Sequence, residues 1–304
     1  MKRTCGLIVL CCCVSAAAHA DVPRSGEDVI GWPEQQLTRE SDTLLDLARH
    51  RGLGYVAMRI ANPGVDPWLP GAGRLIELPL QHVLPNVRRV GIVINLPELR
   101  LYRFVAGQAP VSYAISIGDE GRETPLGSTK VARKAVMPTW FPTLSERTEN
   151  PELPMRVGPG PDNPMGSRAL YLEWNGIAMH GTNQPYSIGR RGSHGCIRLY
   201  PQDIEALYAS TPIGTAVQVI DQRAKVGWLR EQLYLEIHPA TGEANAIEAR
   251  GERVDRVAYD ARALVAQAAG SELSRVDWDA VFLAGLEQTG MPLPVLLPVL
   301  RPLR

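Results

Sequence analysis

From Val87 onward the sequence is a series of short runs rich in β-branched and aromatic residues, and this pattern constrains the fold more than any other feature. The runs include "RVGIVINLPELRLYRF", "VSYAISIG", "STKVARKAVM" and "ALYLEW", and turn signals such as Gly118-Asp119 separate them. Short runs bounded by turn residues predict an antiparallel, β-rich domain. One helix is expected within it, over "YPQDIEALYAS", because Pro201 stands where a first helical turn tolerates proline.

Residues 31–80 have a different pattern, which predicts a small α+β unit. A first helix is expected to begin at Ser41 or Asp42. Its inner face would be formed by the apolar residues Leu44, Leu45, Leu47 and Ala48. A second short helix, "YVAMRIAN", is expected to stop at Asn62, and an extended "RLIELP" follows it.

Residues 222–304 form a third segment, with no clear internal repeat. A hairpin is expected over "WLREQLYLEIHPATGEA", and two helices are expected near residues 254–268 and 276–288. The proline-rich end, "MPLPVLLPVLRPLR", predicts irregular or extended chain.

The first twenty residues have the pattern of a secretory signal peptide. Lys2 and Arg3 precede a short apolar stretch that closes on "AHA", which predicts cleavage after Ala20. Lipidation at one of the leader cysteines is the alternative, but a leucine or another cysteine precedes each of Cys11–Cys13, where a small residue is usual. The leader is of bacterial type, so we expect export to the periplasm. No later stretch reaches eighteen consecutive apolar residues, so no membrane span is expected after cleavage.

Loss of this leader would leave Cys196 as the single cysteine of the mature chain. A lone thiol in an oxidising compartment indicates either a reactive role or deep burial. Formal net charge is zero and the isoelectric point is about 7.0, so nothing favours a nucleic acid or an anionic membrane as partner.

The stretch "MHGTNQPYSIGRRGSHGCIRLY" at residues 179–200 brings chemically active residue types together. A cysteine attacks as thiolate, so it needs a nearby base such as His180 or His194. Glycines beside the cysteine allow tight turns that expose backbone N–H groups to an oxyanion. The combination indicates a cysteine acyltransferase or hydrolase.

Two other interpretations of this stretch remain. Cys196 alone fits a buried structural cysteine, and His180, His194 and Cys196 together offer three zinc ligands. The chain lacks the Cys-x-x-Cys and His-Glu-x-x-His spacings of common zinc sites, so no metal and no cofactor are expected.

The motif "HGT" at residues 180–182, followed by "SHGCIRL" at residues 193–199, resembles the signature of the L,D-transpeptidase catalytic domain, also called the YkuD domain. The upstream "ISIGDEGRETPLGSTKV" and "VGPGPDNPMGSRALYL" resemble the enterobacterial-type periplasmic members. The resemblance covers residues 87–221 and implies a mainly β catalytic domain of β-sandwich type with short helices. Residues 31–80 resemble a LysM module, a wall-binding unit, and residues 222–304 would be a hairpin with a helical extension.

The resemblance also implies roles for individual residues. Cys196 would attack the peptide bond before the terminal D-alanine of a peptidoglycan tetrapeptide stem, with His180 as base. The carbonyl of Gly181 would orient His180, and the N–H groups of Gly195 and Cys196 would hold the oxyanion. Four residues are expected to contact substrate: Arg198 through a stem carboxylate, His194 in a supporting role, Ser193 within the signature, and Tyr186 in the intervening loop.

The acceptor of the acyl group stays open. A second stem peptide would give a cross-link, a lysine of an outer-membrane lipoprotein would give an anchored protein, and water would make the enzyme a carboxypeptidase or hydrolase. A non-catalytic peptidoglycan-binding protein is the remaining alternative. Trp140, in "PTWFP", is expected either to line the cleft or to pack in the core.

Overall fold

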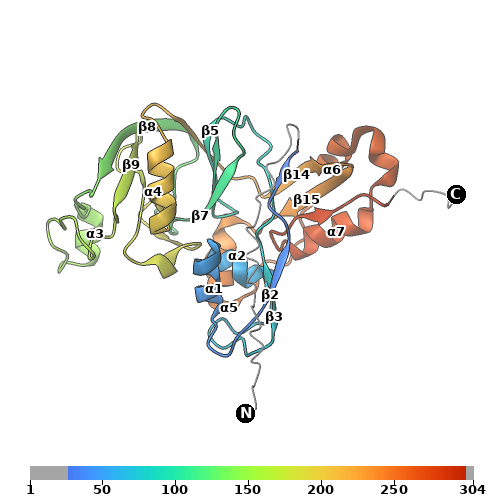
Figure 1. Ribbon diagram of the computed structural model, residues 1–304, viewed down its shortest axis with the longest axis horizontal. Coiled ribbons are helices and arrows are strands. Elements are labelled where there is room, and N and C mark those ends of the chain that lie inside the picture. Colours follow the sequence, from blue (N-terminus) through green and yellow to red (C-terminus); the bar gives the residue numbers. More distant parts are fainter. Residues whose placement is uncertain (1–26, 299–304) are drawn as a thin grey trace, which may run out of the picture.

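A computed structural model describes residues 27–298, and these form three neighbouring parts (Figure 1). A large β unit carrying β5–β13 lies at the left of the view, a small unit with α1 and α2 in the middle, and a unit with β14, β15, α6 and α7 at the right. The expected leader, residues 1–20, lies outside the described residues.

The large unit is one nine-stranded sheet that bends round its core. Its strands, in chain order, are β5 (Gly91–Asn95), β6 (Arg100–Phe104), β7 (Val111–Gly118), β8 (Gly127–Val136), β9 (Arg168–Leu172), β10 (Ala178–His180), β11 (Arg191–Ser193), β12 (Ile197–Leu199) and β13 (Ala216–Ile220). The order across the sheet is β11-β7-β12-β10-β9-β8-β13-β5-β6, and β6 also pairs with β7. The long strand β7 therefore joins the two ends of the sheet, so a single bent sheet stands where a sandwich of two sheets was expected.

The β-rich prediction is confirmed, but the antiparallel prediction is wrong for three strand pairs. β5 with β13, β10 with β12, and β7 with β11 run parallel. Parallel neighbours require a crossover instead of a tight hairpin. The chain makes one such crossover between His180 and Ile197, through residues 181–196, and this is the segment that carries the sequence motif.

Two helices belong to this unit, and the sequence predicted one of them. α4 (Pro201–Ser210) begins at the expected proline and buries Ile204 and Leu207 against the sheet core. α3 (Leu144–Glu149) interrupts the long connection between β8 and β9, residues 137–167.

The small unit at the centre has the order strand, helix, helix, strand. These elements are β2 (Glu34–Leu37), α1 (Leu44–Arg51), α2 (Tyr55–Ala61) and β3 (Leu75–Leu78), and β2 pairs antiparallel with β3. α1 begins later than predicted, because Thr43 is its N-cap and the Thr43 side chain accepts a hydrogen bond from the Asp46 backbone. The predicted inner face is confirmed, since the four apolar residues of α1 are buried.

The third unit contains the predicted hairpin, β14 (Ala224–Leu229) with β15 (Gln232–Ile237), and the short strand β16 (Leu293–Pro294). Its helices are α6 (Arg262–Ala269) and α7 (Trp278–Glu287). α5 (Ala244–Arg250), which the sequence did not predict, follows β15 in the chain but lies beside the central unit, and its Ala244 and Ile247 join the core of the β unit (Figure 1). The helix expected to begin near residue 254 begins later, at Arg262 of α6. The guanidinium of Arg253 donates to the backbone carbonyls of Val257 and Leu286 and holds that segment against α7 in non-helical form.

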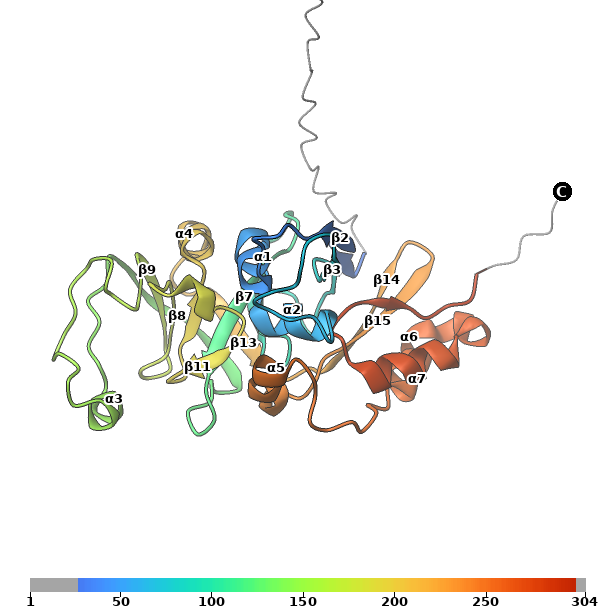
Figure 2. The same cartoon turned by 90° about the horizontal axis from the view of Figure 1, so that it is seen from below.

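The three units share contacts across the middle of the molecule. A short antiparallel pair, β1 (Val29–Ile30) with β4 (His82–Val83), leads into and out of the central unit. Figure 2 shows α2 close to α5, and the two helices pack together. None of the helices within residues 27–298 has the length and apolar character needed to cross a membrane.

Candidate active site

The site is built on the parallel pair β10 and β12, where His180 stands opposite Arg198. Side chains alternate between the two faces of a strand. Met179 and Ile197 are fully buried on the core face. His180 and Arg198 therefore point to the other face, as does Cys196, which lies two residues before Arg198.

These three side chains line one cavity of about 550 Å³. Its walls come from the sheet and from the connection 137–167, which contributes Trp140 and Glu146. Tyr171 of β9 also lines it, and the guanidinium of Arg133 lies 3.7 Å from the centre of that ring. The cavity is large enough for a peptide segment.

His180 is held in one tautomer. Its side chain is buried, and its Nδ1–H donates a hydrogen bond to the Gly181 carbonyl oxygen at 2.7 Å. A carbonyl only accepts, so the proton is on Nδ1 and the lone pair is on Nε2. Burial, together with the nearby Arg198 guanidinium, lowers the pKa of His180 to about 4, so the imidazole is neutral at pH 7.

Cys196 is partly exposed, and its thiol donates to the Gly176 carbonyl oxygen at 3.4 Å. Burial raises the pKa of this thiol, although the Ala178 backbone and the Arg198 charge act in the opposite direction. The resting pair is therefore a thiol and a neutral imidazole. Such a pair needs proton transfer to His180 as the sulfur attacks.

Hydroxyl groups hold the backbone on both sides of the sulfur. Ser193 is buried and its Oγ donates to the Cys196 carbonyl at 2.5 Å, and Thr124 Oγ1 donates to the Gly195 carbonyl at 2.9 Å. Gly195 has φ +95°, a left-handed conformation that favours glycine. Ser193 lines the cavity, but its hydroxyl is already used by this backbone contact.

The two N–H groups expected to hold an oxyanion are those of Gly195 and Cys196. In the part of the chain that the structure describes, neither donates a hydrogen bond to another protein group. Preorganised, unengaged N–H donors beside a nucleophile are what an oxyanion site requires.

The connection 137–167 is folded tightly beside the cavity. Asn163, 1% exposed, donates through its side chain to the carbonyls of Pro138 and Gly158. α3 begins with a capping box in which the side chains of Thr143 and Glu146 bond each other's backbone N–H groups. The motif "TLSE", residues 143–146, is the sequence signal for this unpredicted helix.

The side chain of His194 contacts carboxylates of the connection 137–167. Its Nδ1 lies 3.5 Å from a carboxylate oxygen of Glu146 and its Nε2 lies 3.4 Å from one of Glu149. Arg122 also pairs with Glu149. The structure therefore places His194 at the rim of the cavity, between the cysteine motif and α3.

Arg198 presents an unpaired positive charge to the cavity. Within residues 27–298 its guanidinium makes no hydrogen bond and no ion pair, although the residue is partly buried. An unpaired guanidinium at this depth is suited to a carboxylate ligand, because two of its N–H groups match the two carboxylate oxygens.

Tyr186 does not join this cavity. Its hydroxyl donates to Asp46 of α1 at 2.9 Å, and Arg49 lies 5.1 Å from the centre of its ring. The residue, 45% exposed, lies between the loop and the central unit. Trp140, by contrast, lines the cavity.

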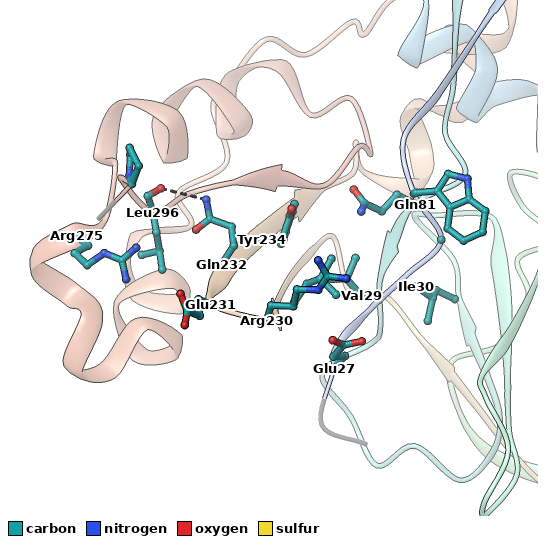
Figure 3. A pocket seen from close by; sticks show the side chains of 14 residues that line it. Glu27, Val29, Ile30, Gln81, Arg230, Glu231, Gln232, Tyr234, Arg275 and Leu296 are labelled. Carbon is teal, nitrogen blue, oxygen red and sulfur yellow. Dashed lines mark hydrogen bonds between the residues drawn. The ribbon is translucent and has the colours of Figure 1, made fainter. Parts of the chain in front are cut away.

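A second cavity, about 600 Å³, lies between β1 and the β14–β15 hairpin (Figure 3). Its lining contains no cysteine and no histidine, and Gln232 there is bonded to the Leu296 carbonyl. The larger cavity is therefore not the place for thiol chemistry.

Among the described residues one group has the spacing of metal ligands: His82, Glu98 and Glu236. The zinc alternative of His180, His194 and Cys196 is not such a group. The ammonium of Lys225 lies 2.8 Å from a carboxylate oxygen of Glu98 and 2.8 Å from one of Glu236. An ammonium therefore already pairs with both carboxylates of this group.

A thiol, a neutral imidazole of fixed tautomer and unengaged backbone N–H groups in one cavity are the parts that acyl transfer through a cysteine requires. The L,D-transpeptidase catalytic domain family, YkuD, matches residues 89–219. The probable L,D-transpeptidase YbiS of Escherichia coli K12 is 39% identical over 236 residues, which cover 75% of this chain and 77% of the relative.

The probable L,D-transpeptidase ErfK/SrfK of Salmonella typhimurium is 41% identical over 233 residues, 74% of this chain and 75% of the relative. A solved L,D-transpeptidase from Mycobacterium smegmatis superposes with a TM-score of 0.35 and 18% identity, covering 50% of this chain and 75% of that one. The chain belongs to the L,D-transpeptidase family.

Proposed function

We propose that the protein is a cysteine-dependent peptidoglycan L,D-transpeptidase that acts in the periplasm after loss of residues 1–20. The observation that supports this most is the placement of His180 at the end of β10 and of Cys196 just before the adjacent parallel strand β12, in one cavity, with Nε2 of His180 as the base. The family membership supplies the substrate class.

In the first half-reaction Sγ of Cys196 attacks the carbonyl carbon of the diaminopimelate residue in a tetrapeptide stem. The thiol proton passes to Nε2 of His180, and the oxyanion accepts hydrogen bonds from the N–H groups of Gly195 and Cys196. The C–N bond to D-alanine then breaks, and His180 gives its proton to the leaving amine. The product is a thioester on Cys196 and free D-alanine. The neutral resting pair supports this general-base route.

Arg198 binds a carboxylate of the stem in this proposal. Its guanidinium is unpaired and lines the same cavity as the sulfur. A fixed carboxylate places the scissile carbonyl beside the nucleophile, and such positioning is a large part of acyl-transfer catalysis.

In the second half-reaction an amine attacks the thioester carbonyl and loses a proton to His180, and the proton returns to the sulfur as the C–S bond breaks. An amine from a second stem gives a cross-link between two diaminopimelate residues. A lysine of an outer-membrane lipoprotein gives a protein joined to the wall, and water gives a shortened stem. The strand-helix-helix-strand order of residues 31–80 supports a LysM-like unit that binds wall glycan.

The proposal is tested with residues 21–304 and a disaccharide tetrapeptide from peptidoglycan, with Cys196→Ala as control. Release of D-alanine together with a cross-linked dimer, seen only with the intact cysteine, supports transpeptidation. Release without a dimer, in the presence of amine acceptors, identifies a carboxypeptidase. Binding of the muropeptide without any D-alanine release would leave a non-catalytic wall-binding protein and overturn the proposal.

A further inference from the structure

The loop that joins the two catalytic residues, residues 181–195, contacts parts of the chain outside the β unit. The backbone N–H groups of Tyr55 and Val56 donate to the carbonyls of Ile188 and Gly189, at 3.2 and 3.0 Å. These donors are in the first turn of α2, whose N-cap Gly54 has no side chain to satisfy them. The loop therefore caps α2, and α2 fixes the loop.

The two backbones approach as closely as glycine permits. A Cβ built on Gly189, where φ is +81°, would lie 2.1 Å from the Cα of Gly54. The hydroxyl of Tyr200, the residue that follows β12, donates to the Leu53 carbonyl at 3.0 Å beside this contact. The central unit is thus docked on the catalytic loop by backbone contacts that leave little room for sliding.

Arg190 connects this junction to α5. Its guanidinium lies 4.1 Å from the centre of the Tyr55 ring on α2 and forms an ion pair with Glu248 of α5. Its carbonyl accepts a hydrogen bond from Ile117 of β7. One side chain therefore contacts α2 and α5 while its backbone is fixed to the catalytic sheet.

The position of Arg190 along the chain gives this contact a consequence for the sulfur. Arg190 immediately precedes β11, and Ser193 at the end of β11 donates to the carbonyl of Cys196. A shift of residues 188–190 is therefore transmitted to the backbone beside the nucleophile within a few residues.

We propose that the central unit and α5 are positioning elements of the active site, and that Arg190 is the positioning residue through which both act on the cysteine loop. This inference rests on the proposed function for its effect on turnover, but not for its effect on the loop. It means that the central unit is part of the catalytic assembly and not an independent tethered binder.

The experiment compares Arg190→Ala with Arg256→Ala in the full mature chain. Arg256 is an exposed arginine that also pairs with a glutamate, Glu252, and so is a matched control. Hydrogen exchange of backbone amides in residues 186–196, the rate of Cys196 alkylation by iodoacetamide, and kcat and KM for D-alanine release are measured for each variant.

We expect Arg190→Ala to lose amide protection in residues 186–193 and to change the alkylation rate, while amides of β5 and β13 keep theirs. The kcat should fall about 10- to 100-fold because the nucleophile is misplaced, with little change in KM. Arg190→Lys should restore part of the protection, since a cation again faces Glu248. Arg256→Ala should resemble the parent protein in every measurement.

Glu248→Gln is the milder second variant if Arg190→Ala does not fold, and it should give the same changes in smaller degree. Unchanged exchange and kcat in these variants would overturn the inference. A parent protein that releases no D-alanine would refute the proposed function instead, while the exchange and alkylation results would still decide the role of Arg190.

Discussion

The Nδ1–H of His180 donates to the carbonyl of Gly181, its own neighbour in the chain, at 2.7 Å. This short-range bond engages Nδ1, so that Nε2 is the nitrogen that can accept a proton, and no carboxylate partner is needed to orient the ring. An imidazole without such a partner stays neutral when buried, which agrees with its lowered pKa. The site therefore favours a general base over a resting ion pair of thiolate and imidazolium.

The first prediction separates the two histidines. His180→Ala should lower kcat for D-alanine release by about 10²- to 10⁴-fold, the usual contribution of a general base. His194→Ala should lower it less than about 10-fold, because His194 contacts Glu146 and Glu149 at the rim. Steady-state assays of both variants decide the matter, and a larger loss for His194 would reverse the assignment of the base.

The second prediction concerns pH and activity. The base must be neutral, so kcat/KM should be retained above the pKa of His180, about 4, and lost below it. A profile measured from about pH 3.5 to 8 should therefore lack an acidic limb near 6.5, the ordinary value for histidine. A limb at that ordinary value would show that His180 is not buried as described.

The same shift links His180 to stability. Its pKa is lower in the folded chain than in the unfolded chain, so the unfolded chain binds the proton first as pH falls. The stabilisation is complete above pH 6.5 and is lost as pH falls to about 4. Between pH 6.5 and about pH 4 the unfolding free energy of the parent protein should fall by about 3 kcal/mol more than that of His180→Gln. Urea unfolding at pH 7 and at about pH 4 measures the difference.

The third prediction concerns Arg198. Its charge lowers the pKa of the Cys196 thiol against the larger effect of burial. Arg198→Ala should therefore raise that pKa further, slow iodoacetamide alkylation at pH 8 and raise KM for a stem with a free carboxylate. Arg198→Lys should keep the charge near the sulfur but lose the paired N–H geometry. An alkylation profile that does not move in Arg198→Ala would remove Arg198 from the thiol's environment.

How far the sequence predicted this site depends on the distance between partners along the chain. His180, Gly181, Gly195 and Cys196 lie within one short stretch, so their motif carried most of the chemistry. The contact of Tyr186 with Asp46 was not predicted, because the two residues are 140 positions apart and no local pattern shows that pairing. The carboxylates beside His194 were not predicted for the same reason, since they come from the connection 137–167.

The strand predictions have a similar limit. Short β runs and turn signals located β5, β6 and β7 well, because alternation and turns are local properties. The pairing of β13 with β5 joins residues over 120 positions apart, as Val217 with Ile92, and is fixed by the closed core. Local periodicity has no information on such a neighbour, so the parallel pairs were not predicted.

The fourth prediction tests the backbone beside the nucleophile. Gly195→Ala should cost about 1–3 kcal/mol of stability, because φ is +95° there. The added Cβ would also lie 3.0 Å from the Ile177 side chain. Turnover should fall more than stability, since the strain displaces the N–H groups beside the sulfur. Ile177→Val in the same chain should relieve the contact but not the strained φ, so thermal unfolding should recover only in part; full recovery would mean that φ is unimportant.

The fifth prediction concerns a buried lysine that joins the β unit to the third unit. Lys225 of β14 is fully buried, and its ammonium donates to Glu98, which follows β5, and to the carbonyl of Val83, at 2.8 and 2.6 Å. It also lies 2.8 Å from a carboxylate oxygen of Glu236 on β15. Lys225 is therefore the ammonium that two buried carboxylates share, although Arg100 also lies 3.9 Å from Glu98.

Lys225→Met should therefore destabilise the protein by about 3–5 kcal/mol, because it removes the cation that both buried carboxylates share. Lys130→Met is the matched control. Lys130 forms an exposed pair with Glu173 at 3.1 Å, and such a surface pair contributes about 0–1 kcal/mol. Adding Glu98→Gln and Glu236→Gln to Lys225→Met removes the two buried carboxylate charges as well and should restore part of the loss. Urea unfolding of the four proteins measures these differences, and equal costs for Lys225→Met and Lys130→Met would show that water reaches this junction.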